Sequence, residues 1–198
     1  MAGTQDTVSG LERLTSLETI TINQLVSSHK GNNFNVLGEG EVLFNLFEEG
    51  HDFSLFSGGR RRSFHMHGVD STGRKVFSLR RPEKSMSDKV ELFMNDALVS
   101  VVRLKAVFLT PVIRIYDAQD NLILRVKGKA TGTANFQLQT STKTPVGSIH
   151  KKTHGSVREI LSHLDDYVIR FPADLDVHLK VAVIAACVLI DFRFHEFN

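Results

Sequence analysis

The sequence predicts a mainly β protein with one buried helix near its C-terminus. Short stretches in which apolar and polar residues alternate recur along most of the chain, clearly so in 112–115 and 136–139. Turn-forming residues separate these stretches, and an uninterrupted apolar run, 182–190, follows near the end. Alternation with a period of two places one face of a strand in the core and the other in water.

Twelve stretches of this kind are strand candidates. They are 20–26, 34–37, 42–47, 64–69, 75–79, 90–94, 98–104, 112–116, 122–126, 135–140, 146–150 and 167–171. Three connections, 38–41, 70–74 and 117–121, are short and turn-rich, which indicates hairpins of one style and a weak internal repeat. Many short strands in one chain predict a sandwich or a barrel, and closure would remove exposed strand edges.

The apolar run predicts a helix over about 175–190. Asp174 stands where an N-cap would lie, and Asp176 adds negative charge to the first turn. A membrane-spanning helix needs about 20 predominantly apolar residues, but the charge-free stretch 181–190 is bounded by Lys180, which could snorkel, and Asp191. We therefore expect the helix to be the buried core of a soluble barrel, followed by a last strand over 192–197. Its expected core residues are Val181, Ile184, Ala185, Val188 and Leu189.

Length and composition predict one domain over 1–198, with 1–10 as a flexible N-terminal tail. The apolar fraction of 41% and the charged fraction of 23% are ordinary for a globular protein, and a net charge of +2 does not indicate bulk binding of nucleic acid. Cys187 is the only cysteine and lies in the apolar run, so we expect it to be buried. The polar N-terminus lacks the features of a signal peptide, which favours the cytosol.

Four basic clusters are candidates for contact with anionic headgroups, the alternative being solvated loops and strand edges. The clusters are Arg60, Arg61 and Arg62; Arg80, Arg81 and Lys84; Lys127 and Lys129; and Lys151 and Lys152 with His150 and His154. We expect surface loops over 50–62 and 80–89, which contain the first two clusters.

Two groups of residues could hold a metal ion. Asp165, Asp166 and Asp174 are a candidate for a weak calcium site, although helix capping and turn chemistry explain Asp174 and Asp176 without any ion and are the favoured interpretation there. His65 and His67 share one strand face at a spacing that can hold a metal, but no third ligand is indicated, so an ordinary strand face is the better interpretation. The sequence contains no motif of a known catalytic site, so it does not predict an enzyme.

The segment 170–192 begins Arg-Phe-Pro-Ala-Asp-Leu-Asp-Val and ends Leu-Ile-Asp-Phe. It resembles the closing segment of the phospholipid scramblases, and similarities at 10–14, 79–82, 147–151 and 157–159 extend the resemblance over nearly the whole chain. The resemblance implies the tubby-like fold, a closed antiparallel barrel of about twelve strands around a central hydrophobic C-terminal helix.

The resemblance also implies a function. It implies calcium-stimulated, bidirectional movement of phospholipids between membrane leaflets, at the cytosolic face of the plasma membrane and with a nuclear pool. The alternative is a β-barrel module that binds headgroups or proteins and moves no lipid. The expected partner is an anionic phospholipid membrane, while protein partners and a homo-oligomer are left open and no specific nucleic acid is implied.

The sequence departs from the family pattern at several positions. Within the calcium segment, 163–174, His163 stands where the family usually has Asp, and Asp166 stands where it often has Asn. The family's palmitoylated cysteine clusters correspond to 56–61 and 83–87, which contain no cysteine, so we expect no palmitoylation and only reversible attachment through basic residues. His150, Lys151 and Lys152 lie in a weak match to the family's nuclear-import stretch.

Overall fold

The computed structural model describes residues 9–25, 32–49, 63–82, 88–105, 110–129, 132–152 and 163–194. For residues 132–133 and 163–165 the description covers the backbone only. The cluster residues Arg60, Arg61, Arg62, Lys84 and His154 lie outside the described residues.

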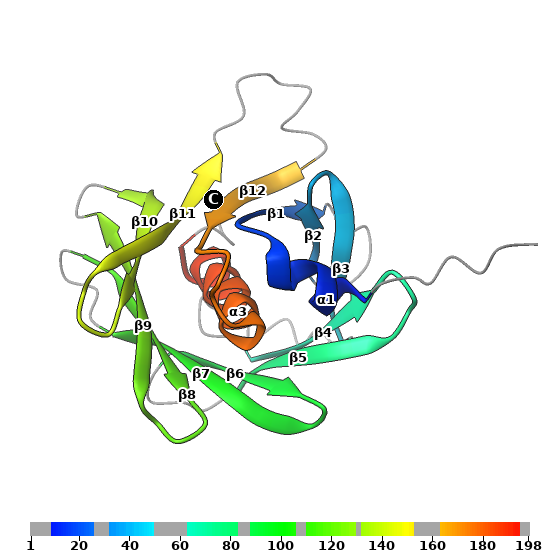
Figure 1. Cartoon of the computed structure of the whole chain (residues 1–198), viewed down its shortest axis with the longest axis horizontal. Helices are drawn as coiled ribbons and strands as arrows, with labels where there is room; N and C mark the ends of the chain where they lie inside the picture. The colour runs from blue at the N-terminus through cyan, green and yellow to red at the C-terminus, as the bar shows by residue number, and fades with distance from the viewer. Residues whose placement is uncertain are drawn as a thin grey trace, which may run out of the picture.

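The described strands form a closed antiparallel barrel in which each strand pairs with its neighbours in sequence and β12 pairs with β1 (Figure 1). The strands are β1 (Thr19–Leu25), β2 (Asn33–Gly38), β3 (Glu41–Glu48), β4 (Phe64–Asp70), β5 (Lys75–Arg81), β6 (Lys89–Met94), β7 (Ala97–Lys105), β8 (Val112–Asp117), β9 (Leu122–Lys129), β10 (Gly132–Thr140), β11 (Pro145–Lys152) and β12 (His163–Arg170). The predicted fold class is confirmed, and each of the twelve strand candidates coincides with one of these strands. Closure leaves no strand edge unpaired.

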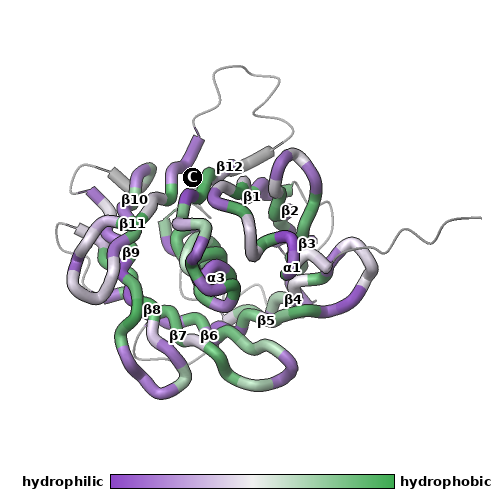
Figure 2. Tube along the Cα trace, viewed as in Figure 1, coloured by the Kyte–Doolittle hydropathy of each residue, from purple (hydrophilic) through white to green (hydrophobic). Residues whose placement is uncertain are grey.

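Helix α3 (Val177–Phe194) runs through the centre of the barrel (Figure 1). Figure 2 shows it as a largely hydrophobic segment surrounded by the ring of strands. Residues Val181 to Ile190 are each at most 1% exposed, and these include the five core residues that the sequence predicts. Cys187 is buried among them, as expected. A helix that is apolar on all sides is therefore buried on all sides by the strands.

Both ends of α3 differ from the prediction. Asp176, and not Asp174, caps the helix, since its Oδ1 accepts a hydrogen bond of 2.8 Å from the backbone N–H of His178. The predicted last strand over 192–197 is wrong for 192–194, where the helix continues to Phe194, while 195–197 lie outside the described residues. The pairing of β12 with β1 already closes the barrel, and the buried ring of Phe192 packs on Phe64 with centroids 4.4 Å apart.

A short helix near the N-terminus, α1 (Gly10–Ser16), is not among the elements that the sequence predicts. A capping box starts it: the N–H of Glu12 donates to Ser9 Oγ at 3.3 Å, and the N–H of Ser9 donates to Glu12 Oε2 at 3.0 Å. Leu14, a residue of this helix, is fully buried. Ser9 and Gly10, which the predicted tail includes, therefore belong to an ordered, packed element.

The repeated hairpin style is confirmed at two of the three predicted places. The turns 70–74 and 117–121 share one pattern, in which the N–H of the first residue donates to the carbonyl of the fifth at 3.0 Å. The connection 38–41 is different, a two-residue turn with positive φ at Glu39 and Gly40. The third copy of the shared pattern is 140–144, which is not among the predicted hairpins.

Candidate functional site

A basic groove of about 810 Å³ lies on the outer face of β9 to β12. Alternation along β9 fixes which of its long side chains reach the groove: Val126 is buried on the inner face, whereas Lys127 and Lys129 are exposed on the outer face. On β11, His150 and Lys152 are likewise exposed on the outer face, and the half-buried Lys151 lies between them in the sequence. The groove is lined by Thr110, Lys127, Gly128, Lys129, Asn135, Phe136, Gln137, Gly147, Ser148, Ile149, His150, Lys152, Val168 and Arg170.

Strand register brings distant residues into one row across this groove. Lys127 pairs with Gln137, Gln137 pairs with Ser148, and Ser148 pairs with Arg170. Neighbouring strands are about 4.8 Å apart, so the row spans about 14 Å from the backbone of Lys127 to that of Arg170. A cation thus stands at each end, with an amide and a hydroxyl between them that can donate hydrogen bonds.

The floor of the groove depends on a close approach between β11 and β12. A Cβ atom on Gly147 would lie 2.1 Å from the carbonyl oxygen of Arg170, so only glycine fits at this position. Of the described residues that line the groove, none is acidic. Three lysines and one arginine therefore surround the space, and cations arranged in this way attract anions with several oxygens.

The groove unites two of the four predicted basic clusters, Lys127 with Lys129 and His150 with Lys152, while Lys151 is half-buried beside them. Arg170 was not singled out from the sequence as part of a basic cluster. Only the strand register could have identified it, because Arg170 follows Lys127 by 43 residues in the sequence. The strand pairings place the two residues in the same row. The weak nuclear-import match, 150–152, is part of a strand paired on both sides.

The cluster at the end of β5 is divided by the fold. Arg80 is exposed, and its guanidinium lies 5.1 Å from the centroid of the Phe93 ring. Arg81 is only 3% exposed and forms an ion pair of 2.6 Å with Asp88. The second carboxylate oxygen of Asp88 lies 3.1 Å from Arg193 Nε, near the end of α3. Arg81 therefore helps to fix the helix in the barrel, and it is unavailable for headgroup contact.

The described calcium candidates do not converge. Asp166 is 7% exposed in the middle of β12, where it faces away from the core, since its neighbour Tyr167 faces inward and donates to Asp191 of α3 at 3.0 Å. Asp174 is exposed in the turn after β12. Arg170 lies four residues after Asp166 on the same strand, which is about 13 Å at the usual rise per residue. Asp174 comes after Arg170, beyond the end of that strand. The side chain of Asp165 lies outside the described residues.

Lys180 is fully buried where α3 enters the barrel, so it does not snorkel to the surface. Its ammonium group donates to the backbone carbonyls of Leu14, Thr15, Leu17 and Ala173 at 3.2, 2.7, 2.9 and 2.9 Å. Three of these carbonyls are at the C-terminal end of α1, where a positive charge is favoured. Burial lowers the pKa of Lys180, and the carboxylates of Asp174 and Glu18 oppose that shift.

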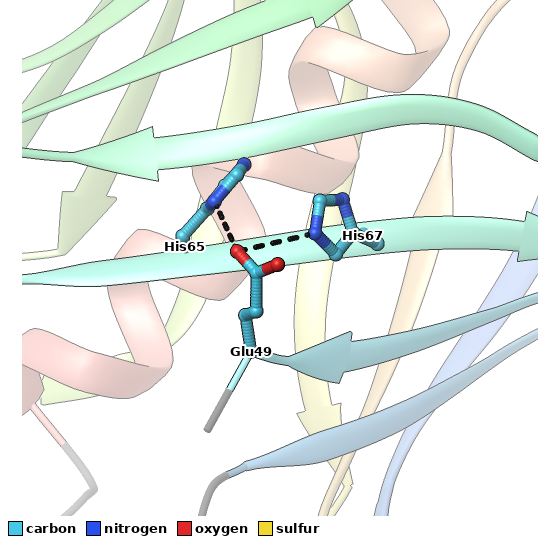
Figure 3. A group of neighbouring side chains, drawn as sticks. All are labelled: Glu49, His65 and His67. Atoms are coloured by element: carbon cyan, nitrogen blue, oxygen red, sulfur yellow. Dashed lines mark ion pairs between the residues drawn. The ribbon is translucent and has the colours of Figure 1, made fainter. Parts of the chain in front are cut away.

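A separate cluster of potential metal ligands lies on the outer face of the barrel, beside β3 and β4. Among the described residues, one group of potential metal ligands has all its ligand atoms within 4.8 Å of one another: Glu49, His65 and His67. Figure 3 shows both imidazoles directed at one carboxylate, with Glu49 Oε2 at 2.7 Å from His65 Nδ1 and 3.4 Å from His67 Nε2. The third ligand that the sequence did not indicate is therefore Glu49.

None of the helices in the described part of the chain is long and apolar enough to cross a membrane. The fold and the groove together define a class of protein, a β-barrel filled by its own C-terminal helix that carries a cationic site on its outer wall. The comparisons with known proteins give this class a family. Residues 4–197 match the Scramblase family model, so the chain belongs to that family.

The similar proteins agree with this assignment. The chain is 28% identical to "Phospholipid scramblase family member 5" of Homo sapiens, over 94% of this chain and 77% of that protein. It is 27% identical to "Phospholipid scramblase 2" of Bos taurus, over 94% of this chain and 71% of that protein. A protein of Arabidopsis thaliana solved by X-ray crystallography has a similar, tubby-like fold, with a TM-score of 0.51 and 15% identity over 87% of this chain and 90% of that one.

Proposed function

We propose that this protein moves phospholipids in both directions between membrane leaflets, that calcium stimulates this movement, and that the basic groove on β9 to β12 contacts anionic headgroups. It acts at the cytosolic face of the plasma membrane, attached reversibly by its cations, and does not catalyse a chemical conversion. Membership of the Scramblase family supports the coarse function. The observation that supports the lipid contact is the cationic groove. Its described lining residues include no acidic side chain that could compete with a phosphate for the cations.

The chemistry of the groove suits a phospholipid headgroup. Lysine and arginine side chains donate charge-assisted hydrogen bonds to phosphate oxygens, and Gln137 and Ser148 lie between them on the same row. Each cation close to an anionic membrane surface contributes about 1 kcal/mol to attachment. Four fixed cations therefore supply about 4 kcal/mol, enough for a reversible contact without an acyl chain.

Calcium stimulation is the finer part of this proposal, and the resemblance of the segment 163–174 supports it. We expect weak calcium binding, with submillimolar affinity at best, because the carboxylates in this segment are few and calcium prefers six to eight oxygen ligands. Titration calorimetry of the whole chain checks this expectation. Micromolar binding that survives Asp174→Ala would show that calcium is held elsewhere.

Reconstitution tests the function directly. The whole chain is incorporated into liposomes that contain a fluorescent phospholipid in both leaflets, and dithionite is added to bleach the outer leaflet. Scrambling brings inner-leaflet lipid to the surface, so fluorescence falls below the level that remains in protein-free liposomes, and calcium increases the rate of this fall. Fluorescence that stays at that level, with and without calcium, refutes lipid transport.

The second candidate function is a headgroup-binding or protein-binding module that moves no lipid. The observation that favours it is the burial of α3, because the most apolar segment of the chain is already covered by strands. Co-sedimentation with the same liposomes separates the two functions. Binding without scrambling supports the module, and binding with scrambling supports the scramblase.

A further inference from the structure

We propose that Glu49, His65 and His67 form a binding site for a divalent transition-metal ion of the zinc class on the outer wall of the barrel. The three side chains come from two neighbouring strands and converge around one point (Figure 3). This site is separate from the basic groove and from the segment 163–174, so it depends on neither part of the proposed function.

The backbone positions these ligands firmly. His65 and His67 alternate on β4 with the buried residues Phe64 and Met66, so both imidazoles must face outward on the same side of the sheet. The N–H of Glu49 donates to the carbonyl of His65 at 2.8 Å, which continues the ladder between β3 and β4 by one step. His65 and His67 therefore lie on one strand of the closed barrel, and a backbone hydrogen bond holds Glu49 beside them.

The distances suit a small ion with short bonds. Zinc binds imidazole nitrogen at about 2.0–2.1 Å and carboxylate oxygen at about 2.0–2.2 Å, so two ligand atoms of a tetrahedral site are about 3.4 Å apart. The separations from Glu49 Oε2 are 2.7 Å to His65 Nδ1 and 3.4 Å to His67 Nε2. The Glu49 side chain is 60% exposed, so its carboxylate can move by the few tenths of an ångström that coordination requires.

The donor set selects the class of metal. Two imidazoles and one carboxylate suit zinc and its neighbours, whereas calcium and magnesium prefer oxygen ligands alone. Three protein ligands leave a fourth position for water. The exposed ring of Phe47, 5.6 Å from the His67 ring between centroids, forms an apolar wall on one side.

Titration of the whole chain with Co²⁺ alone, followed by its visible absorption, and competition for Zn²⁺ against a chromophoric chelator test the site. We expect one ion per chain with absorption typical of a low-coordinate nitrogen and oxygen site. His65→Ala and His67→Ala should each weaken Zn²⁺ binding by at least about 100-fold, because loss of a direct ligand exceeds the usual effect of an outer partner. Glu49→Gln, which keeps the shape of the side chain, should weaken it by at least about 10-fold.

His178→Ala is the matched control. His178 also faces a carboxylate, with Nδ1 at 3.2 Å from Asp176 Oδ1, but no second imidazole belongs to that described pair. Its replacement should leave Zn²⁺ affinity unchanged, and Zn²⁺ should raise the melting temperature of the parent chain but not of His67→Gln. Absence of binding, binding that survives His65→Ala and His67→Ala, or an equal loss in His178→Ala would each overturn the proposal.

Discussion

Lys180 and Lys127 carry the same ammonium group in opposite surroundings. Lys180 is fully buried and donates to four backbone carbonyls, so its charge is satisfied by the protein itself. Lys127 is exposed in a groove where no acidic side chain is among the described lining residues. The difference separates two roles for charge in this barrel: the interior cation holds α1 and α3 together, and the groove cations are a surplus that an external anion can neutralise.

The largest expected effect is in the interior. Ile184→Asp places an unpaired carboxylate at a fully buried position on α3, where the cost of an uncompensated charge exceeds the few kcal/mol by which a domain is stable. We expect the variant not to fold, as judged by circular dichroism. If it stays folded and loses only membrane attachment, the helix is an anchor and its burial does not describe the working protein.

Lys180→Met should be destabilising by about 3 kcal/mol or more. Methionine fills a similar volume but removes the ammonium donor from the carbonyls of Thr15, Leu17 and Ala173, while Leu14 O keeps the N–H of Leu17. Each buried acceptor without a partner costs about 1–3 kcal/mol. Urea unfolding measures the effect, with His178→Met, an exposed position on the same helix, as the control. A loss below about 1 kcal/mol would mean that water satisfies these carbonyls and that Lys180 is not a tether.

The interior was the part that the sequence predicted best, and its errors have a common cause. An all-apolar run can only be buried, so the helix and its core residues followed directly from the pattern. The ends of α3 did not, because Phe192, Arg193 and Phe194 alternate in sequence as a strand would. Only the pairing of β12 with β1 shows that the barrel needs no further strand. The role of Lys180 was hidden as well, since its acceptors on α1 are more than 160 residues away.

In the groove, the double variant Lys127→Gln with Arg170→Gln should weaken binding to anionic vesicles and leave the fold intact. Two cations at about 1 kcal/mol each correspond to about 30-fold in affinity. Binding by the parent chain should also fall steeply with salt, since the Debye length shortens to about 3 Å at 1 M. Co-sedimentation with vesicles measures both effects.

Lys75→Gln with Lys105→Gln is the control for that variant, because it removes the same charge from exposed positions that do not line the groove. Equal weakening by both pairs would mean that net charge, and not the groove, attracts the membrane. A lower melting temperature in the groove variant alone would mean that Lys127 and Arg170 serve the fold, which would remove the contrast with Lys180.

The two outer sites could be predicted only in part. Lys127, Lys129, His150 and Lys152 stand in local clusters that the sequence displays, but Arg170 joins them through register alone. His65 and His67 were visible as a pair on one strand face. Glu49 was not, because its place beside them depends on which residue of β3 lies opposite His65. Sequence patterns reveal the face of a strand, while the neighbour across the sheet is set by the whole barrel.

A third lysine, Lys143, extends the comparison, and its replacement has the smallest expected effect. Lys143 is exposed in the turn 140–144 and has a φ of 71°, a left-handed conformation that disfavours a residue with a Cβ atom. Gly73 occupies the same place in the matching turn 70–74, with a φ of 82° and nothing within 4 Å of where its Cβ would be. The two turns therefore isolate the backbone preference from packing.

Lys143→Gly should stabilise the protein by about 0.5 kcal/mol, because the relief of about 1–2 kcal/mol of left-handed strain exceeds the added entropy cost of glycine, about 0.5–1 kcal/mol. The melting temperature should rise by about 1–2 °C in a chain of this size. Gly73→Ala is the reciprocal change and should lower stability by about 0.5 kcal/mol, since the same two terms act with opposite sign. Vesicle binding should be unaffected by Lys143→Gly, since this lysine is outside the groove. A loss of binding as large as that from Lys127→Gln would show that the position of a cation on this barrel does not matter, and a fall in stability would show that the Lys143 side chain supports its turn.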